Sequence, residues 1–172
     1  MALQRYKIDG YGQLELNAVA FRRSGRIEAQ CKIADGIEYI ENGMLLAVNN
    51  ISRQVEFVSA DNKHLPVALN YTSEHMYDNR ANALKDFKLE PGSFLPRLGY
   101  LGAGDKYTTN CVDYAGEESA LWQAIEDGTV LYAHAGTDGY HLVNTTAEGA
   151  IALVIGATTM PDGQKAVKFQ AL

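Results

Sequence analysis

The sequence predicts a mainly β protein, either a β-barrel or a sandwich, with one short inserted helix and an extended N-terminal arm. Short apolar or alternating segments recur between clusters of Gly, Asn, Asp and Pro, which is typical of strands joined by tight turns. Only one segment shows convincing helical periodicity, so a parallel α/β sheet is not expected. The chain has 172 residues, 47% hydrophobic and 21% charged, as in a folded domain. We expect an arm over residues 1–35 and a single β-rich domain over residues 36–172.

Turn-forming residues locate the first predicted strands. Asn42-Gly43 interrupts the alternating apolar residues of 37–48, and Asn-Gly is the strongest short hairpin signal because both residues tolerate positive φ. A second turn is expected at Asn49-Asn50, which makes residues 37–58 a β-meander. Prolines and polar residues then interrupt the pattern, so residues 60–98 form the predicted irregular connecting region. One short helix could form over 78–87, where two asparagines weaken it.

The last third of the chain gives clearer patterns. Strands are predicted over 98–101 and 106–114, around a turn at 102–105. Residues 117–127 predict the helix, with acidic residues in its first turn and Gly128 after its end. Two further hairpins are predicted, 130–135 with 140–143 and 151–160 with 165–172, each joined by a Gly- and Asp-containing turn.

The pair His134 and His141 is the candidate metal site. A four-residue loop over 136–139 would place the two histidines directly opposite each other, with Cβ atoms about 5 Å apart, close enough to share a metal ion. The third ligand would have to come from His64, His75, Asp113 or Asp138, and no spacing identifies it. The alternative is a pair of surface or half-buried histidines. We expect no metal and no cofactor.

Other catalytic patterns fail on their context. Residues 99–108 (GYLGAGDKYT) contain glycines and Lys106, but a phosphate loop needs Gly-Lys-Ser/Thr opening a helix, and here a strand follows. A turn with a charged tip is expected instead. No Gly-x-Ser-x-Gly elbow is present, and Cys31 and Cys111 are expected to be free buried thiols in a reducing compartment. The sequence therefore predicts a protein that is not an enzyme.

Charge is unevenly distributed along the chain. Residues 1–32 carry six basic and three acidic side chains, whereas the whole chain has a net charge of -6. The basic segment could dock on an acidic surface, and the alternative is a solvated mixture of charges. Nucleic acid is not an expected partner of so acidic a chain. No apolar run is long enough to span a bilayer and the start resembles no signal peptide, so we expect no membrane association and synthesis in the cytoplasm.

A set of short strings occurs in a familiar order: NGML at 42–45, EHMYDNR at 74–80, DFKLEPG at 86–92, PRLG at 96–99, GDKYTTN at 104–110 and MPDGQK at 160–165. Over most of its length the chain resembles the decoration, or cement, proteins of tailed-bacteriophage heads. The resemblance implies a virion protein on the capsid exterior, made in the host bacterial cytoplasm. It further implies binding to the major capsid protein and to copies of itself, without catalytic residues.

The resemblance supplies no residue motif for the interface, so the candidate capsid-binding residues are taken from the basic segment of the arm: Arg22, Arg23 and Arg26. Two alternatives stay open at this stage. One is a structural component of the phage tail or neck. The other is a metal-dependent β-barrel enzyme or small-ligand binder that uses His134 and His141.

Overall fold

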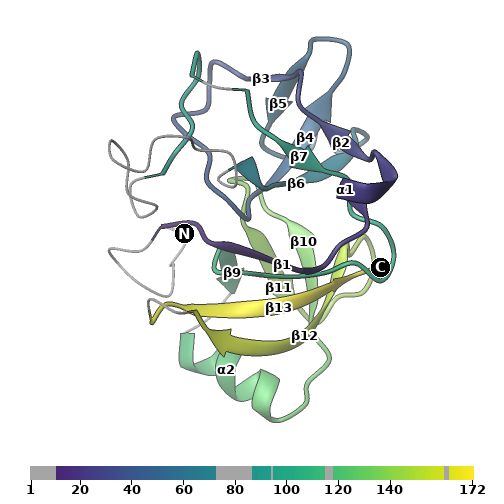
Figure 1. Ribbon diagram of the computed structural model, residues 1–172. Helices are drawn as coiled ribbons and strands as arrows, with labels where there is room; N and C mark the ends of the chain where they lie inside the picture. The colour runs from purple at the N-terminus through teal and green to yellow at the C-terminus, as the bar shows by residue number, and fades with distance from the viewer. Residues whose placement is uncertain (1–10, 73–86, 94, 115–117, 161–162) are drawn as a thin grey trace.

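The mainly β fold is confirmed by a computed structural model, which describes residues 11–72, 87–93, 95–114, 118–160 and 163–172. The described residues form two sheets that lie one above the other in the view of Figure 1. The arrangement is sandwich-like and does not close into a barrel. The possible helix over 78–87 falls almost entirely outside the described residues.

The larger sheet contains seven described strands in the order β1-β8-β13-β12-β10-β11-β9. Neighbours are antiparallel except β9 and β11, which run parallel. The strands are β1 (Leu14–Ala18), β8 (Lys106–Thr109), β9 (Val112–Tyr114), β10 (Tyr132–Ala135), β11 (His141–Asn144), β12 (Ala152–Thr159) and β13 (Lys165–Ala171). The predicted hairpins near the C-terminus are confirmed as β10–β11 and β12–β13.

The smaller sheet contains six described strands in the order β2-β7-β6-β4-β5-β3. They are β2 (Ile27–Glu28), β3 (Lys32–Ile33), β4 (Leu45–Asn49), β5 (Gln54–Glu56), β6 (Val67–Asn70) and β7 (Leu98–Gly99). The predicted turn at Asn49-Asn50 is confirmed between β4 and β5, where the Asn49 side-chain oxygen accepts hydrogen bonds from Ile51 and Ser52 amides, both at 3.1 Å.

The two described helices differ in how well the sequence predicts them. The predicted helix is confirmed as α2 (Glu118–Glu126), which contacts β12 and places Leu121 in the core. The single turn α1 (Phe21–Ser24) has no sequence signal beyond Gly25, which ends it with φ 71°. Phe21 is fully buried, and its ring occupies space that a side chain at Gly99 would need, since a Cβ there would lie 2.5 Å from the ring.

Strand β4 joins the two halves of the core. Leu45, Leu46, Ala47 and Val48 are all fully buried, because successive side chains point to opposite faces and both faces are covered. Leu45 belongs to the apolar cluster under the larger sheet, and Leu46 to the cluster within the smaller one. The described residues thus share a core that is continuous through one strand.

Residues 11–35 of the predicted arm belong to the body of the fold. They supply β1 to the larger sheet and β2 and β3 to the smaller one, with α1 between them. This part of the arm is therefore integral to the fold and does not extend from it. The sequence did not predict these strands, because the segment is polar and because β2 and β3 are only two residues long and lie at sheet edges.

Three local predictions are corrected by long-range pairing. The turn at Asn42-Gly43 forms, but no hairpin does: Ile40 pairs with Leu89, and β4 pairs with β5 and β6. The predicted strand 106–114 is divided into β8 and β9, which lie far apart in the sheet order. The predicted connecting region contains β6, which lies between β4 and β7 near the middle of its sheet.

Candidate functional site

Two of the three arginines singled out from the sequence, Arg22 and Arg23, lie on α1 and line an open groove of about 860 Å³, and Arg26 follows the helix. The groove is lined by Leu16, Asn17, Ala18, Val19, Ala20, Arg22, Arg23, Ser24 and Asp105. Arg22 and Arg23 are exposed on α1, where the one-turn helix projects them away from the core that holds Phe21. The groove therefore has an apolar and neutral wall along β1 and a basic end at α1.

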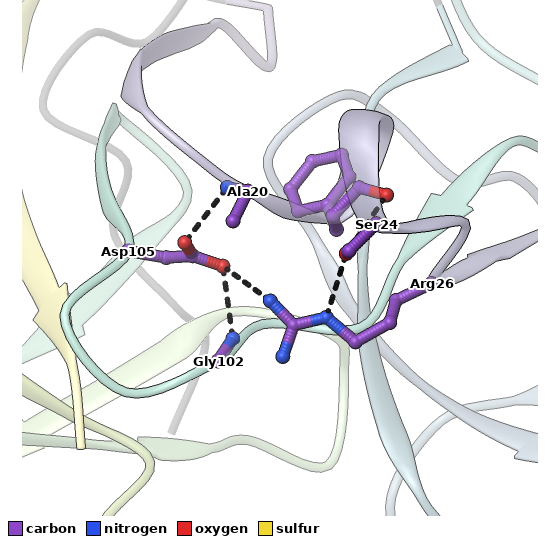
Figure 2. A network of polar contacts seen from close by, with 6 residues as sticks. Ala20, Ser24, Arg26, Gly102 and Asp105 are labelled. Atoms are coloured by element: carbon purple, nitrogen blue, oxygen red, sulfur yellow. Dashed lines mark hydrogen bonds and ion pairs between the residues drawn. The ribbon is translucent and has the colours of Figure 1, made fainter.

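The base of the groove is fixed by Asp105, whose carboxylate is only 5% exposed. Figure 2 shows its two oxygens divided among three donors. One oxygen accepts the Ala20 amide at 2.8 Å, and the other accepts the Gly102 amide at 2.9 Å and lies 3.5 Å from the Arg26 guanidinium. Hydrogen bonds to an ionised acceptor are stronger than neutral ones. Asp105 thus ties the end of β1 to the turn before β8.

Arg26 has a different role from the other two arginines. Its guanidinium bonds the Ser24 hydroxyl at 3.1 Å and pairs with Asp105, so it holds the loop after α1 against the turn at 102–105 (Figure 2). The guanidinium lies directly against Gly102, where an added Cβ would require the end of the Arg26 side chain to shift. Arg22 and Arg23 line the groove, and Arg26 is not among its lining residues.

The predicted charged tip of the turn at 102–105 is found in part, because Lys106 is exposed whereas Asp105 is buried. The turn itself forms, with Gly104 at φ 87°. The sequence missed Asp105 as a site residue because its partners, Ala20 and Arg26, are distant in the chain. The only available signal was an aspartate next to two glycines, which is equally typical of an exposed turn.

The two histidines of the candidate metal site point to opposite faces of the sheet. In the β10–β11 register His134 pairs with Leu142 and His141 pairs with Ala135, one residue away from the predicted pairing. The loop is one residue longer than predicted, because Tyr140 belongs to it and its carbonyl accepts the Gly136 amide at 2.8 Å. His134 bonds the Thr146 carbonyl at 2.9 Å. The pair cannot share a metal ion across this hairpin.

His141 is fully buried in the core of the larger sheet. Its Nδ1 donates to the Cys111 carbonyl at 3.0 Å, so its Nε2 accepts from the Tyr107 hydroxyl, also at 3.0 Å. Its ring stacks on Phe169 with centroids 4.7 Å apart. Burial lowers the pKa of His141 to about 4 and raises that of Tyr107. This pair holds β8 to β11 from inside and faces no open cavity.

The thiols also lie inside the protein. Cys31 and Cys111 are buried thiols that form no disulfide, as predicted, and burial raises the pKa of the Cys31 thiol. Across the described ranges, no group of three or more His, Cys, Asp or Glu side chains is placed to hold a metal ion. The groove at α1 is therefore the candidate functional site that the described geometry offers.

The resemblance to phage head decoration proteins stays a prediction after comparison of the chain with known proteins. No protein-family model, no curated protein and no solved structure matches the chain. Within the described residues, no helix has the length and apolar character to cross a membrane.

Proposed function

We propose that this chain is a non-enzymatic structural protein of a tailed-phage virion, which binds the outer surface of the capsid shell and stabilises it. The proposal is supported by the resemblance of its sequence strings to head decoration proteins. The single structural observation that carries it is the basic end of the groove, where Arg22 and Arg23 are displayed on an otherwise acidic chain. The expected partners are the major capsid protein and copies of the chain itself.

The groove is suited to a partner because its residues are ordered before binding. The Asp105 carboxylate holds the end of β1 and the turn at 102–105, and Arg26 holds the loop after α1. A surface that is already ordered loses little conformational entropy when a partner docks. The arginines at this surface can thus contribute most of their electrostatic attraction to binding.

The groove also borders the segment that connects the two sheets. The chain runs from β1 in the larger sheet through α1 to β2 in the smaller sheet (Figure 1). Phe21 anchors this connection, with its ring 5.1 Å from that of Tyr71, beside β6. A partner bound at α1 therefore contacts the segment that couples the two sheets, as a protein that reinforces a shell requires.

Charge sets how the chain would approach its partner. The net charge of -6 keeps copies apart in solution, whereas the basic patch attracts an acidic surface locally. A modest contact suffices on a symmetric shell, because many copies bind and neighbouring copies raise each other's effective concentration. Binding should weaken with salt, since exposed charges are screened beyond about 8 Å at physiological ionic strength.

The test is co-sedimentation with empty shells assembled from the major capsid protein of the phage that encodes this chain. The wild-type protein should sediment with the shells and raise the temperature at which they disassemble. The variant Arg23→Glu should bind about tenfold more weakly, since it replaces attraction by repulsion at the groove.

The matched control is Lys63→Glu, an identical change of charge at an exposed turn away from the groove. It should bind within about twofold of the wild type. Equal binding by all three proteins would reject the groove as the contact. Failure of the wild type to bind shells, with binding to assembled tail tubes or neck rings, would move the proposal to that part of the virion.

A further inference from the structure

The strand that borders the groove, β1, lies at an edge of the larger sheet. β1 lies at the end of the larger sheet and pairs, within the described residues, only with β8. An edge strand presents backbone N–H and C=O groups that can bond to another extended chain. The edge is anchored at both ends, because Asn110 accepts the Gln13 amide at 2.7 Å and Asp105 accepts that of Ala20.

The groove follows β1 and the residues after it. A hollow over one face is lined by every second residue of a strand, since successive side chains point to opposite faces. Here the lining includes Leu16, Asn17 and Ala18 in succession, and continues through residues 19 and 20. The register shift between Glu15 and Ala18 interrupts the alternation at these residues, so the hollow follows the irregular part of β1 and the residues after it.

Polarity changes from one end of the groove to the other. Exposed Glu15 stands near the beginning of β1, half-buried Leu16 and Val19 border the middle, and Arg22 and Arg23 stand at the α1 end. An anion at the α1 end meets attraction, whereas an anion beside Glu15 meets repulsion. The matching ligand is extended, apolar in its middle, and acidic where it reaches α1.

We infer that the groove binds an extended acidic peptide segment of the partner, which lies along the open edge of β1 with its carboxylates at the α1 end. The inference rests on the proposed function, because it assigns this segment to the capsid protein. The pairing is short, because the β1–β8 register shifts between Glu15 and Ala18, and such irregularities bend an edge strand. Charge complementarity therefore supplies specificity, and a few backbone hydrogen bonds supply orientation.

The probe is a labelled synthetic peptide of about six residues, the length of an ordinary strand, in which a run of Val is followed by Glu residues at one end. Fluorescence polarisation at about 50 mM salt should detect its binding to the full-length wild-type chain. Arg23→Glu should weaken that binding about tenfold and Lys63→Glu by less than about twofold. A peptide with Lys in place of Glu should not bind. Equal affinities for the three proteins, or for the two peptides, would overturn the inference.

Backbone pairing is tested with two versions of the peptide, N-methylated at alternate positions. A strand bonds a neighbour through the N–H groups of every second residue, so one version should lose binding and the other should keep it. Equal binding by both versions would overturn the strand arrangement. Equal binding by an oligothymidylate of similar charge would show recognition of any polyanion, and would overturn the peptide assignment.

The peptide and shell assays separate the two proposals. Peptide binding without shell binding would refute the proposed function and leave the groove assignment standing. Shell binding that depends on Arg23, without peptide binding, would refute the assignment and leave the function standing.

Discussion

Acidification should destabilise this protein well above the pH at which most carboxylates titrate, because of His141. This imidazole is fully buried and accepts a hydrogen bond from Tyr107 in its neutral form. Burial lowers its pKa from 6.5 to about 4 in the folded protein. The unfolded chain therefore binds more protons than the folded chain between these two values, and stability falls as the pH falls through this window.

The size of the effect follows from the shift. A change of one pKa unit corresponds to about 1.4 kcal/mol, so the full loss is about 3 kcal/mol once the pH is below 4. About 2 kcal/mol of it should appear between pH 7.5 and 5, where few other groups titrate. Burial, together with Asp138, raises the pKa of Asp113, so the folded chain binds this proton before the unfolded chain does as the pH falls, which opposes part of the loss.

Urea denaturation at successive pH values, followed by circular dichroism, measures this slope. The variant His141→Gln keeps a donor and an acceptor in the core but cannot titrate, so its stability should be nearly flat between pH 7.5 and 5. His134→Gln, at a half-buried position, is the control and should keep the wild-type slope. A slope that survives in His141→Gln, or a wild type equally stable at pH 7.5 and 5, would refute the reasoning.

Two further predictions concern stability around the groove and the turns. Asp105→Ala should lower the free energy of unfolding by about 2–4 kcal/mol, since two backbone amides lose a charged acceptor. Arg26→Ala should lower it by less than about 1 kcal/mol, because the ion pair of Arg26 is partly exposed. Equal losses for the two variants in urea denaturation would contradict this. Gly43→Ala should cost at least about 3 kcal/mol and Gly104→Ala about 1 kcal/mol. Both glycines have positive φ, but only at Gly43 does an added Cβ overlap another residue, and similar melting temperatures for the two variants would be inconsistent with that difference.

Local patterns predicted the elements whose partners are adjacent in the chain. The β12–β13 hairpin and α2 were identified correctly because their turns, periodicity and end signals are all contained in a short segment. The same rules failed at Asn42-Gly43. The turn forms there, but Ile40, two residues before it, pairs with Leu89 and not with a strand after the turn. A local sequence pattern gives no information about so distant a partner.

The candidate site likewise has one part that local sequence predicted and another that depends on segments distant in the chain. Clustered arginines at 22, 23 and 26 drew attention to the segment that borders the groove, since charge composition is a local property of the sequence. The buried carboxylate of Asp105 could not be foreseen, because it depends on two segments that meet only in the folded protein. The histidine pair failed for a smaller reason: one additional loop residue reverses the face to which a strand's side chains point.

The central claim is that the surface formed by β1 and α1 contacts the capsid. A cryo-EM difference map between shells with and without the bound protein tests it most directly. The account predicts added density on the outer surface of the shell, oriented so that Arg22 and Arg23 face the capsid protein. Absence of added density, or density in which α1 faces solvent, would contradict it.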